Sequence, residues 1–326
     1  MGGKLGRLRT AALLLLSMHL MANPAAANDV VRVGILKFGT VSWELDTIKH
    51  NRFDEKHGVE VDVRFFASED ATNVAMMAGD VDIIVSDWLW VSRQRASGVD
   101  LTMVPYSTAA GAVMVPENSS IRSLGDLRGH SLGVAGGPLD KSWLLIQGLA
   151  QKRHAIELSE ENAISYGAPP LLAEKARQGE IDAVLNFWNY CARLEALGFR
   201  RLVGAKEAGE ALGASGPVAA LGYVFHESWA KAHRHAIEGF IAASADAKSL
   251  LEHSDAEWRR LAPIIQGEES EQRVMRDRYR EGIPKRPVED EEKDAGALYA
   301  VLAQLGGEKL VGPSRILMPG TFWGVE

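Results

Sequence analysis

The sequence contains a single cysteine, Cys191, in 326 residues. One thiol cannot form an internal disulfide, and it cannot supply a cysteine-based metal site. Cysteine is among the most frequently buried residue types, and a lone exposed thiol would be open to oxidation outside the cytoplasm. We therefore expect Cys191 to be a buried and chemically inert side chain.

Positive charge is also scarce. Lys and Arg total 36 against 43 Asp and Glu, which gives a formal net charge of −7. Proteins that bind nucleic acid neutralise phosphates with clustered Lys and Arg, so this composition argues against a nucleic-acid partner. Beyond residue 27 the sequence has no apolar run near the roughly 20 residues that a membrane-spanning helix needs. These absences predict a water-soluble mature protein.

The first 27 residues have the pattern of a secretory signal peptide. Lys4, Arg7 and Arg9 give a basic start, a short apolar run follows, and three alanines precede Asn28. This order is typical of a cleaved export signal, and the apolar run is too short for a membrane anchor. Cleavage before Asn28 removes three positive charges, which changes the formal net charge from −7 to −10. The sequence therefore predicts a periplasmic protein.

After residue 28, short apolar strands alternate with helical patterns. The expected strands lie at 30–36, 59–66, 81–85 and 101–106, and the expected helices at 43–57, 71–78 and 88–96. Glycines close the helical segments, as is common at helix C-termini. Strands and helices in alternation predict a parallel sheet with right-handed crossovers.

The same alternation begins again further along the chain. Strands are expected at 112–115, 131–135 and 181–185, a helical turn at 123–127, and helices at 139–154 and 170–178. The sequence GEIDA at 179–183 repeats the pattern of GDVDI at 79–83, which indicates two related α/β lobes. A mostly helical section to about residue 305 follows, and the tail at 306–326 is expected to wrap over the surface. Two such lobes favour a clamshell with its cleft at the strand carboxyl ends.

Several segments resemble the nitrate/sulfonate/taurine-type substrate-binding proteins of ABC importers, a group that includes the thiamine-precursor binders. The matching segments are VGIL at 33–36, FDEKHGVEVDV at 53–63, MAGDVDI at 77–83, SLGDLRGHSLGV at 123–134 and GEIDA at 179–183. Their order also matches, and the resemblance covers about residues 30–225. One departure is His130, where the family usually has lysine.

The resemblance implies a periplasmic-binding-protein fold of type II, in which two hinge strands join the lobes. By this analogy the chain crosses between the lobes near 110–115 and 219–224. The first lobe would comprise 28–112 and 223–326, including the C-terminal helices, and the second lobe 113–222. The implied function is capture of a small solute by lobe closure and its delivery to an ABC permease in the inner membrane. We expect a monomer that needs no cofactor.

The loops after the predicted strands hold the candidate ligand contacts. They are Lys37, Thr40, Trp43, Glu69, Ser86, Asp87 and Trp88 in the first lobe, Gly137, Asp140, Lys141, Asn186 and Trp188 in the second lobe, and Tyr223 near the second hinge. Structural roles compete with ligand binding at several of these positions. Thr40 precedes a helix that it could cap, which is favoured over ligand binding there, and Asp87 precedes a helix whose dipole it could compensate. Trp43 is equally suited to burial in an amphipathic helix.

Acidic and aromatic side chains outnumber basic ones in these loops, where Lys37 and Lys141 are the only bases. An anion-binding site would direct Arg or Lys at its ligand. Carboxylates with indole rings better suit a cationic, amine-bearing or heteroaromatic solute. A cluster of Glu69, Asp70, Asp87 and Asp140 would alternatively bind a hard metal ion.

Enzyme activity is a competing interpretation, because eukaryotic relatives of the thiamine-precursor binders are enzymes. No H-E-x-x-H or P-loop pattern occurs in the sequence, and both are signatures of catalytic or nucleotide-binding sites. His233 and His235 lie two residues apart on a predicted helix, so their side chains point to different faces. The sequence therefore favours a binding protein, which would serve either a permease or a sensor.

Overall fold

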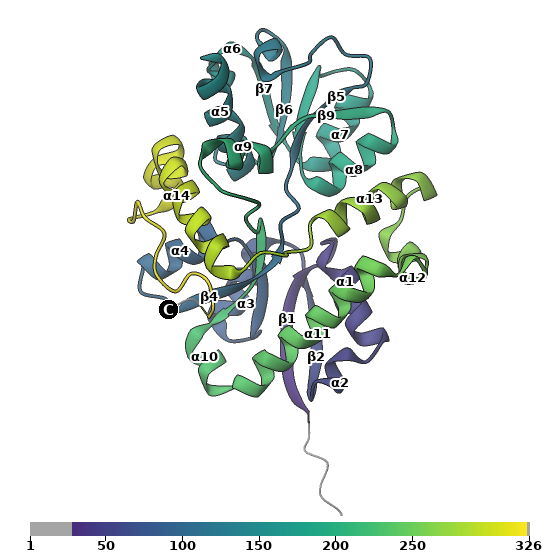
Figure 1. The fold of residues 1–326 in the computed structure, drawn as a ribbon, viewed down its shortest axis with the longest axis vertical. Coiled ribbons are helices and arrows are strands. Elements are labelled where there is room, and N and C mark those ends of the chain that lie inside the picture. Colours follow the sequence, from purple (N-terminus) through teal and green to yellow (C-terminus); the bar gives the residue numbers. More distant parts are fainter. Residues whose placement is uncertain (1–27, 325–326) are drawn as a thin grey trace, which may run out of the picture.

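The computed structural model describes residues 28–324. The predicted signal peptide at 1–27 lies outside the described residues. Two α/β lobes are stacked one above the other and are joined by extended segments between them (Figure 1). Within the described range, no helix is both long enough and apolar enough to cross a membrane.

The first lobe is built on a five-stranded sheet in the order β2-β1-β3-β10-β4. Its strands are β1 (Asp29–Leu36), β2 (Val59–Phe66), β3 (Ile83–Ser86), β4 (Leu101–Ser107) and β10 (Leu221–His226). Strand β1 pairs in parallel with β2 and β3, whereas β10 is antiparallel to both β3 and β4. The sheet is therefore mixed, with a single reversed strand near one edge.

The second lobe repeats this arrangement in the order β7-β6-β8-β5-β9. Its strands are β5 (Ala112–Pro116), β6 (Ser131–Ala135), β7 (Ala163–Gly167), β8 (Ala183–Asn186) and β9 (Phe199–Gly204). Here β5 is the reversed strand, antiparallel to β8 and β9. The repeated order confirms the two related lobes that the sequence predicts.

The alternation of strands and helices predicts parallel sheets, and this is wrong for β10 and β5. Each of these strands enters its sheet from the other lobe: β5 follows β4, and β10 follows the last helix of the second lobe. The other strands run toward the cleft, while a strand that arrives through the cleft must run away from it. The two reversals are thus a geometrical consequence of the two crossings.

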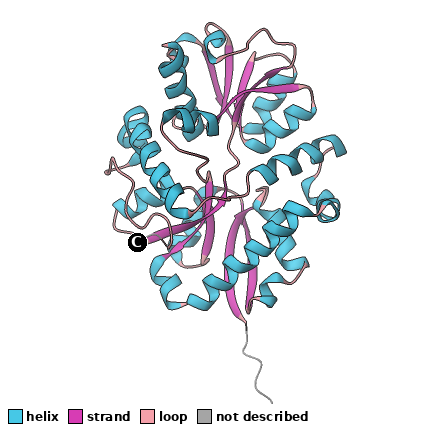
Figure 2. Cartoon of the chain, in the orientation of Figure 1, coloured by secondary structure: helices cyan, strands magenta, loops and turns pink. Residues whose placement is uncertain are grey.

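Helices cover the sheets on both sides (Figure 2). In the first lobe they are α1 (Val41–His50), α2 (Phe53–Lys56), α3 (Glu69–Ala78) and α4 (Trp88–Ala96). In the second lobe they are α5 (Lys141–His154), α6 (Leu158–Glu161), α7 (Pro169–Arg177), α8 (Trp188–Ala196) and α9 (Ala205–Leu212), and a 3-10 turn spans Leu124–Leu127.

The prediction of a single helix at 43–57 is wrong. Arg52 adopts a left-handed conformation with φ of 55°, which ends α1 and starts α2.

The C-terminal section is helical, as predicted. It consists of α10 (Glu227–Ala232), α11 (Arg234–His253), α12 (Asp255–Ile265), α13 (Glu269–Glu281) and α14 (Val288–Val311). Helix α11 packs on α1 and α2, whereas α13 packs on α8, and α14 contacts α4 as well as α5 and α9. Helices α13 and α14 lie on opposite sides of the crossings (Figure 1). The sequence groups all these helices with the first lobe, but α13 and α14 contact both lobes.

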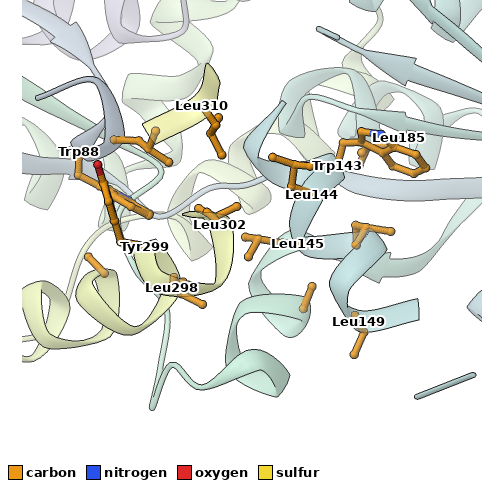
Figure 3. Close-up of a cluster of buried hydrophobic side chains, with 14 of the residues drawn as sticks. Trp88, Trp143, Leu144, Leu145, Leu149, Leu185, Leu298, Tyr299, Leu302 and Leu310 are labelled. Carbon is orange, nitrogen blue, oxygen red and sulfur yellow. The ribbon is translucent and has the colours of Figure 1, made fainter. Parts of the chain in front are cut away.

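The largest apolar core is continuous between the lobes through α14. Trp88 of α4 lies against Tyr299 of α14, and Leu298 and Leu302 of the same helix face Leu145 of α5 (Figure 3). Burial of such side chains contributes about 1.5–3 kcal/mol each. This side of the molecule is therefore held together by packing in addition to the chain crossings.

The tail after α14 departs from the surface wrap predicted for it. Phe322 is buried in the core. Met103 N of β4 donates a hydrogen bond to Thr321 O over 3.0 Å, and Trp323 N donates to Met103 O over 2.9 Å. The tail thus covers the free edge of β4, and an exposed strand edge is a common site of unwanted pairing between chains.

Candidate functional site

A pocket opens at the carboxyl ends of the first-lobe strands. It lies between the ends of β1, β3 and β4 and the starts of α1 and α3, with a volume of about 440 Å³ that includes open solvent. Its apolar wall includes Val41, Val85 and Leu221, and its polar side chains are Thr40, Glu69, Thr72 and Tyr106. We call it the strand-end pocket. Open α/β sheets bind ligands at this edge, and Thr40 and Glu69 are contacts predicted from the sequence.

A second pocket, the hinge pocket, adjoins the two crossings. Its lining includes Trp88 of α4, Lys141 of α5 and Ala220 of the second crossing. Lys141 Nζ lies 3.4 Å from Asp87 Oδ2 and 5.1 Å from the centroid of the Trp88 ring, and it donates a hydrogen bond to Ala220 O over 3.2 Å. One ammonium group of the second lobe therefore contacts two predicted site residues of the first.

Asp87 and Asp140 occupy equivalent places in the two lobes, each directly before a helix. Asp87 Oδ1 accepts a hydrogen bond from Trp90 N, and Asp140 Oδ1 accepts one from Trp143 N, both over 2.9 Å. Such caps typically stabilise a helix by about 1 kcal/mol. Asp87 thus caps α4, a role beyond the dipole compensation considered for it, and its second oxygen faces Lys141. Thr40 occupies the N-cap position of α1, but its side chain makes no capping hydrogen bond. The prediction that Thr40 caps this helix is therefore wrong.

Charged groups of the two lobes lie within electrostatic reach of one another. Glu69 is exposed to the cleft, yet the surrounding protein removes part of its water; this desolvation and the nearby Asp87 raise the pKa of Glu69. Desolvation also raises the pKa of Asp140, although the Trp143 N–H and Lys141 oppose this rise. Both shifts reflect mainly the loss of water around the two carboxylates.

The acidic residues do not form a metal site. Among residues 28–324, no group of three or more His, Cys, Asp or Glu side chains is arranged to hold a metal ion. Asp87, a member of the suggested metal cluster, instead faces the Lys141 ammonium. The metal-binding alternative therefore receives no support from the described part of the chain.

An aromatic cluster joins the lobes on the side opposite α14. The Trp43 ring of α1 meets the Trp188 ring of α8 edge to face, with centroids 6.0 Å apart. Tyr279 of α13 lies 6.1 Å from Trp43 and 6.5 Å from Trp188, and Trp258 of α12 completes the cluster. Trp43 and Trp188, both predicted from the sequence as ligand contacts, thus contact each other between the lobes.

A buried charge lies close to the strand-end pocket. Glu44 of α1 has no exposed surface and accepts hydrogen bonds from Tyr223, Ser244 and Tyr279 over 2.8, 2.6 and 3.0 Å. Lys248 Nζ of α11 donates to both carboxylate oxygens of Glu44 over 2.7 Å. Desolvation lowers the pKa of Lys248, an effect that the Glu44 charge opposes. This network fixes the relative positions of α1, β10, α11 and α13.

The remaining predicted contacts are dispersed. Tyr223 is buried within the Glu44 network, and Ser86 is buried at the end of β3. Asn186 is also buried, and its Nδ2 donates to Pro169 O over 2.9 Å. Lys37 is exposed in the loop after β1, and Gly137 is half-buried in the loop before α5.

Tyr106 lines the strand-end pocket and is absent from the contacts predicted from the sequence. It lies near the carboxyl end of β4, just as Ser86 lies at that of β3. The same strand-end rule would therefore have identified it. Glu44 gives no such signal, because only the fold brings together the donors that surround it.

One sequence pattern associated with catalysis takes a structural role. The segment GHSLG at 129–133 has the spacing G-x-S-x-G, which in hydrolases forms a sharp turn from a strand into a helix. Here Ser131 begins strand β6, and its hydroxyl donates to Asp182 Oδ2 over 2.7 Å. The hydroxyl thus links the amino-terminal ends of strands β6 and β8, on the side of the sheet away from the cleft.

The family model described as "NMT1/THI5 like" matches residues 50–255. The chain belongs to this family. The match agrees with the resemblance noted in the sequence, which extends to the thiamine-precursor binders. A comparison with curated proteins finds no match.

Several solved structures similar to this NMT1/THI5-like chain are binding proteins by their titles. The periplasmic aliphatic sulphonate binding protein SsuA from Escherichia coli has a TM-score of 0.72 and 20% identity, over 91% of this chain and 93% of that one. The alkanesulfonate-binding protein SsuA from Xanthomonas axonopodis pv. citri, bound to MOPS, has a TM-score of 0.66 and 19% identity, over 92% and 99%.

A third similar structure is the ligand binding component of an ABC-type import system from Staphylococcus aureus, with zinc bound. Its TM-score is 0.65 and its identity 11%, over 92% of this chain and 99% of that one. At these identities the likeness establishes the fold alone. This member of the NMT1/THI5-like family therefore has the two-lobed periplasmic-binding-protein fold that the sequence predicts.

Proposed function

We propose that this protein captures a small solute between its lobes and delivers it to an ABC permease from the periplasm. The observation that carries the proposal is the meeting of Asp87 and Trp88 of the first lobe with Lys141 of the second at the hinge pocket, whose lining comes from both lobes. A solute held there contacts both lobes, so its binding favours the closed arrangement. The family and the fold agree with this role.

We also propose that the protein is not an enzyme. Closure requires only that the solute interacts more favourably with the closed arrangement than with the open one. The groups at the cleft are engaged in positioning: two carboxylates cap helices and the ammonium pairs with one of them. Recovery of unaltered solute from the complex, followed by mass spectrometry, checks this part of the proposal.

A screen with purified protein comprising residues 28–326 tests solute capture. Amines, pyrimidines, sulfonates, small acids and metal ions are compared by thermal unfolding, and positives are measured by small-angle scattering. A true solute raises Tm, because binding to the folded state adds about 2.7 kcal/mol at a hundredfold excess over Kd, and it reduces the radius of gyration. A screen without any such solute, or a solute that binds with no change in dimensions, contradicts capture by closure.

Replacement of Trp188 by alanine is expected to weaken capture about tenfold. The change removes the ring that meets Trp43 across the lobes, and an aromatic pair contributes about 0.5–1.5 kcal/mol beyond the burial of its area. Isothermal titration calorimetry with the identified solute measures the loss. Trp323→Ala, which changes a tryptophan at the edge of the first lobe, is the control, and equal affinity in wild type and Trp188→Ala contradicts the prediction.

A further inference from the structure

The strand-end pocket is lined by one charged side chain and by three hydroxyl groups. Among its lining residues only Glu69 carries a charge. Thr72 is engaged, because its hydroxyl donates to Glu69 O over 2.8 Å. The hydroxyls of Thr40 and Tyr106 lie close to each other, and Thr40 makes no capping hydrogen bond. These three groups define what the pocket recognises.

Tyr106 carries a polar atom that lacks a partner. Its side chain is 3% exposed, and its hydroxyl makes no hydrogen bond of normal geometry among residues 28–324, although the Tyr279 and Thr40 side chains lie close enough to lower its pKa. Burial and the neighbouring Glu44 raise the pKa of Tyr106, so the group remains an O–H donor at physiological pH. Leaving a buried hydroxyl unpaired costs about 1–3 kcal/mol, which a ligand acceptor at this position would recover.

No positively charged side chain lines the pocket, although the exposed Lys37 lies in the loop between its lining residues Leu36 and Gly39. Lys248 lies 4.8 Å from the centroid of the Tyr106 ring, but both of its close oxygen contacts are to Glu44. Lys141, the nearest cation of the other lobe, lies beside Asp87. An anionic head group would therefore face Glu69 without a counter-charge, whereas an ammonium would be paired.

We infer that the captured solute is an organic ammonium that also carries a neutral hydrogen-bond acceptor and an apolar body. This inference rests on the proposed function. The ammonium pairs with Glu69, and the acceptor receives hydrogen bonds from the hydroxyls of Thr40 and Tyr106. The apolar body lies against Val41 and Leu221.

Four probes of nearly equal shape separate these requirements. They are 2-phenoxyethylamine, which has all three features, 3-phenylpropylamine, which lacks the acceptor, 2-phenoxyethanol, which lacks the ammonium, and phenoxyacetate, which is an anion. Isothermal titration calorimetry is expected to rank 2-phenoxyethylamine first. 3-Phenylpropylamine should bind at least about tenfold more weakly, since the hydrogen bonds from Thr40 and Tyr106 to the acceptor are lost, and the uncharged and anionic probes more weakly still.

Two substitutions connect this ranking to the residues. Tyr106→Phe should reduce the advantage of 2-phenoxyethylamine over 3-phenylpropylamine while leaving the protein folded, because the Tyr106 hydroxyl makes no hydrogen bond of normal geometry in the described part of the protein. Glu69→Gln should weaken both amines about tenfold or more. Asp70→Asn is its matched control, because it makes the same charge change one residue away, outside the lining of the pocket.

The pH dependence of amine binding supplies an independent measurement. The charges that face Glu69 are Asp70 of its own helix, Asp87 of the next loop and Lys141 of the other lobe. Since the pKa of Glu69 is raised, the carboxylate gains its proton at a higher pH than usual, and amine binding should weaken as pH falls through this range. The weakening should disappear in Glu69→Gln and persist in Asp70→Asn.

Tighter binding of phenoxyacetate than of 2-phenoxyethylamine, or equal binding of all four probes, would overturn the inference. If none of the four binds while the wider screen finds a solute that closes the lobes, the inference fails and the proposed function stands. If no solute closes the lobes, the proposed function fails as well.

Discussion

Replacement of Lys248 by methionine is expected to reduce the free energy of unfolding by about 3–5 kcal/mol. The substitution leaves the Glu44 carboxylate fully buried without its counter-charge, and an uncompensated buried charge is among the most destabilising changes known in proteins. Three hydroxyl donors remain on Glu44 and prevent a larger loss. Urea denaturation followed by circular dichroism measures the effect.

The double variant Glu44→Gln/Lys248→Met identifies the cause. It removes both charges together, so most of the lost stability should return, because a buried ion pair adds little net stability over uncharged groups of similar shape. Lys231→Met serves as a surface control, since its partner Glu227 is one helical turn away at an exposed site, where such pairs contribute under about 1 kcal/mol. A loss of under 1 kcal/mol in Lys248→Met would contradict the account of the network.

Cys191 in the folded protein is expected to react at least a hundredfold more slowly with thiol reagents than an exposed cysteine. Burial raises the pKa of its thiol to about 11, so only about one thiol in a thousand is ionised at pH 8, against roughly a quarter for an ordinary thiol. The sulfur also donates a hydrogen bond to Asn186 O over 3.2 Å. Ellman's reagent, used with and without urea, reports the difference.

A surface thiol provides the reference rate. Cys191→Ala/Ser249→Cys places a single cysteine on the exposed face of α11, and it should react rapidly in the folded protein. Reaction of wild-type Cys191 within a factor of ten of this variant would show that the lobe around α8 opens more readily than its packing implies. The buried state of Cys191 itself confirms what the single cysteine predicts.

The local elements were predictable because their signals are local. The glycines after α3 and α7 end these helices in the left-handed conformation that favours glycine, and alternating apolar residues identify β2. The position of a strand within its sheet could not be predicted in this way. The position of β10 between β3 and β4 depends on pairing with residues more than 100 positions away, and no local pattern encodes that.

The candidate site shows the same division. Asp87, Trp88 and Lys141 were found from the sequence because each lies just after a strand, where the fold places ligand contacts. Their mutual contact was not predictable, since it depends on how the lobes face each other. The acidic character of the loops was visible, but the assignment of Asp87 and Asp140 to helix capping required their backbone geometry.

The insertion of β10 between β3 and β4 sets the order in which the lobes are completed. The strands of the second sheet lie between residues 112 and 204, so that sheet can assemble from one continuous stretch of chain. The first sheet must wait for residues 221–226, although its other strands are made first. Contacts of such wide sequence separation form slowly. The N-terminal third of the newly made chain therefore stays without its finished sheet until two-thirds of the protein has been synthesised.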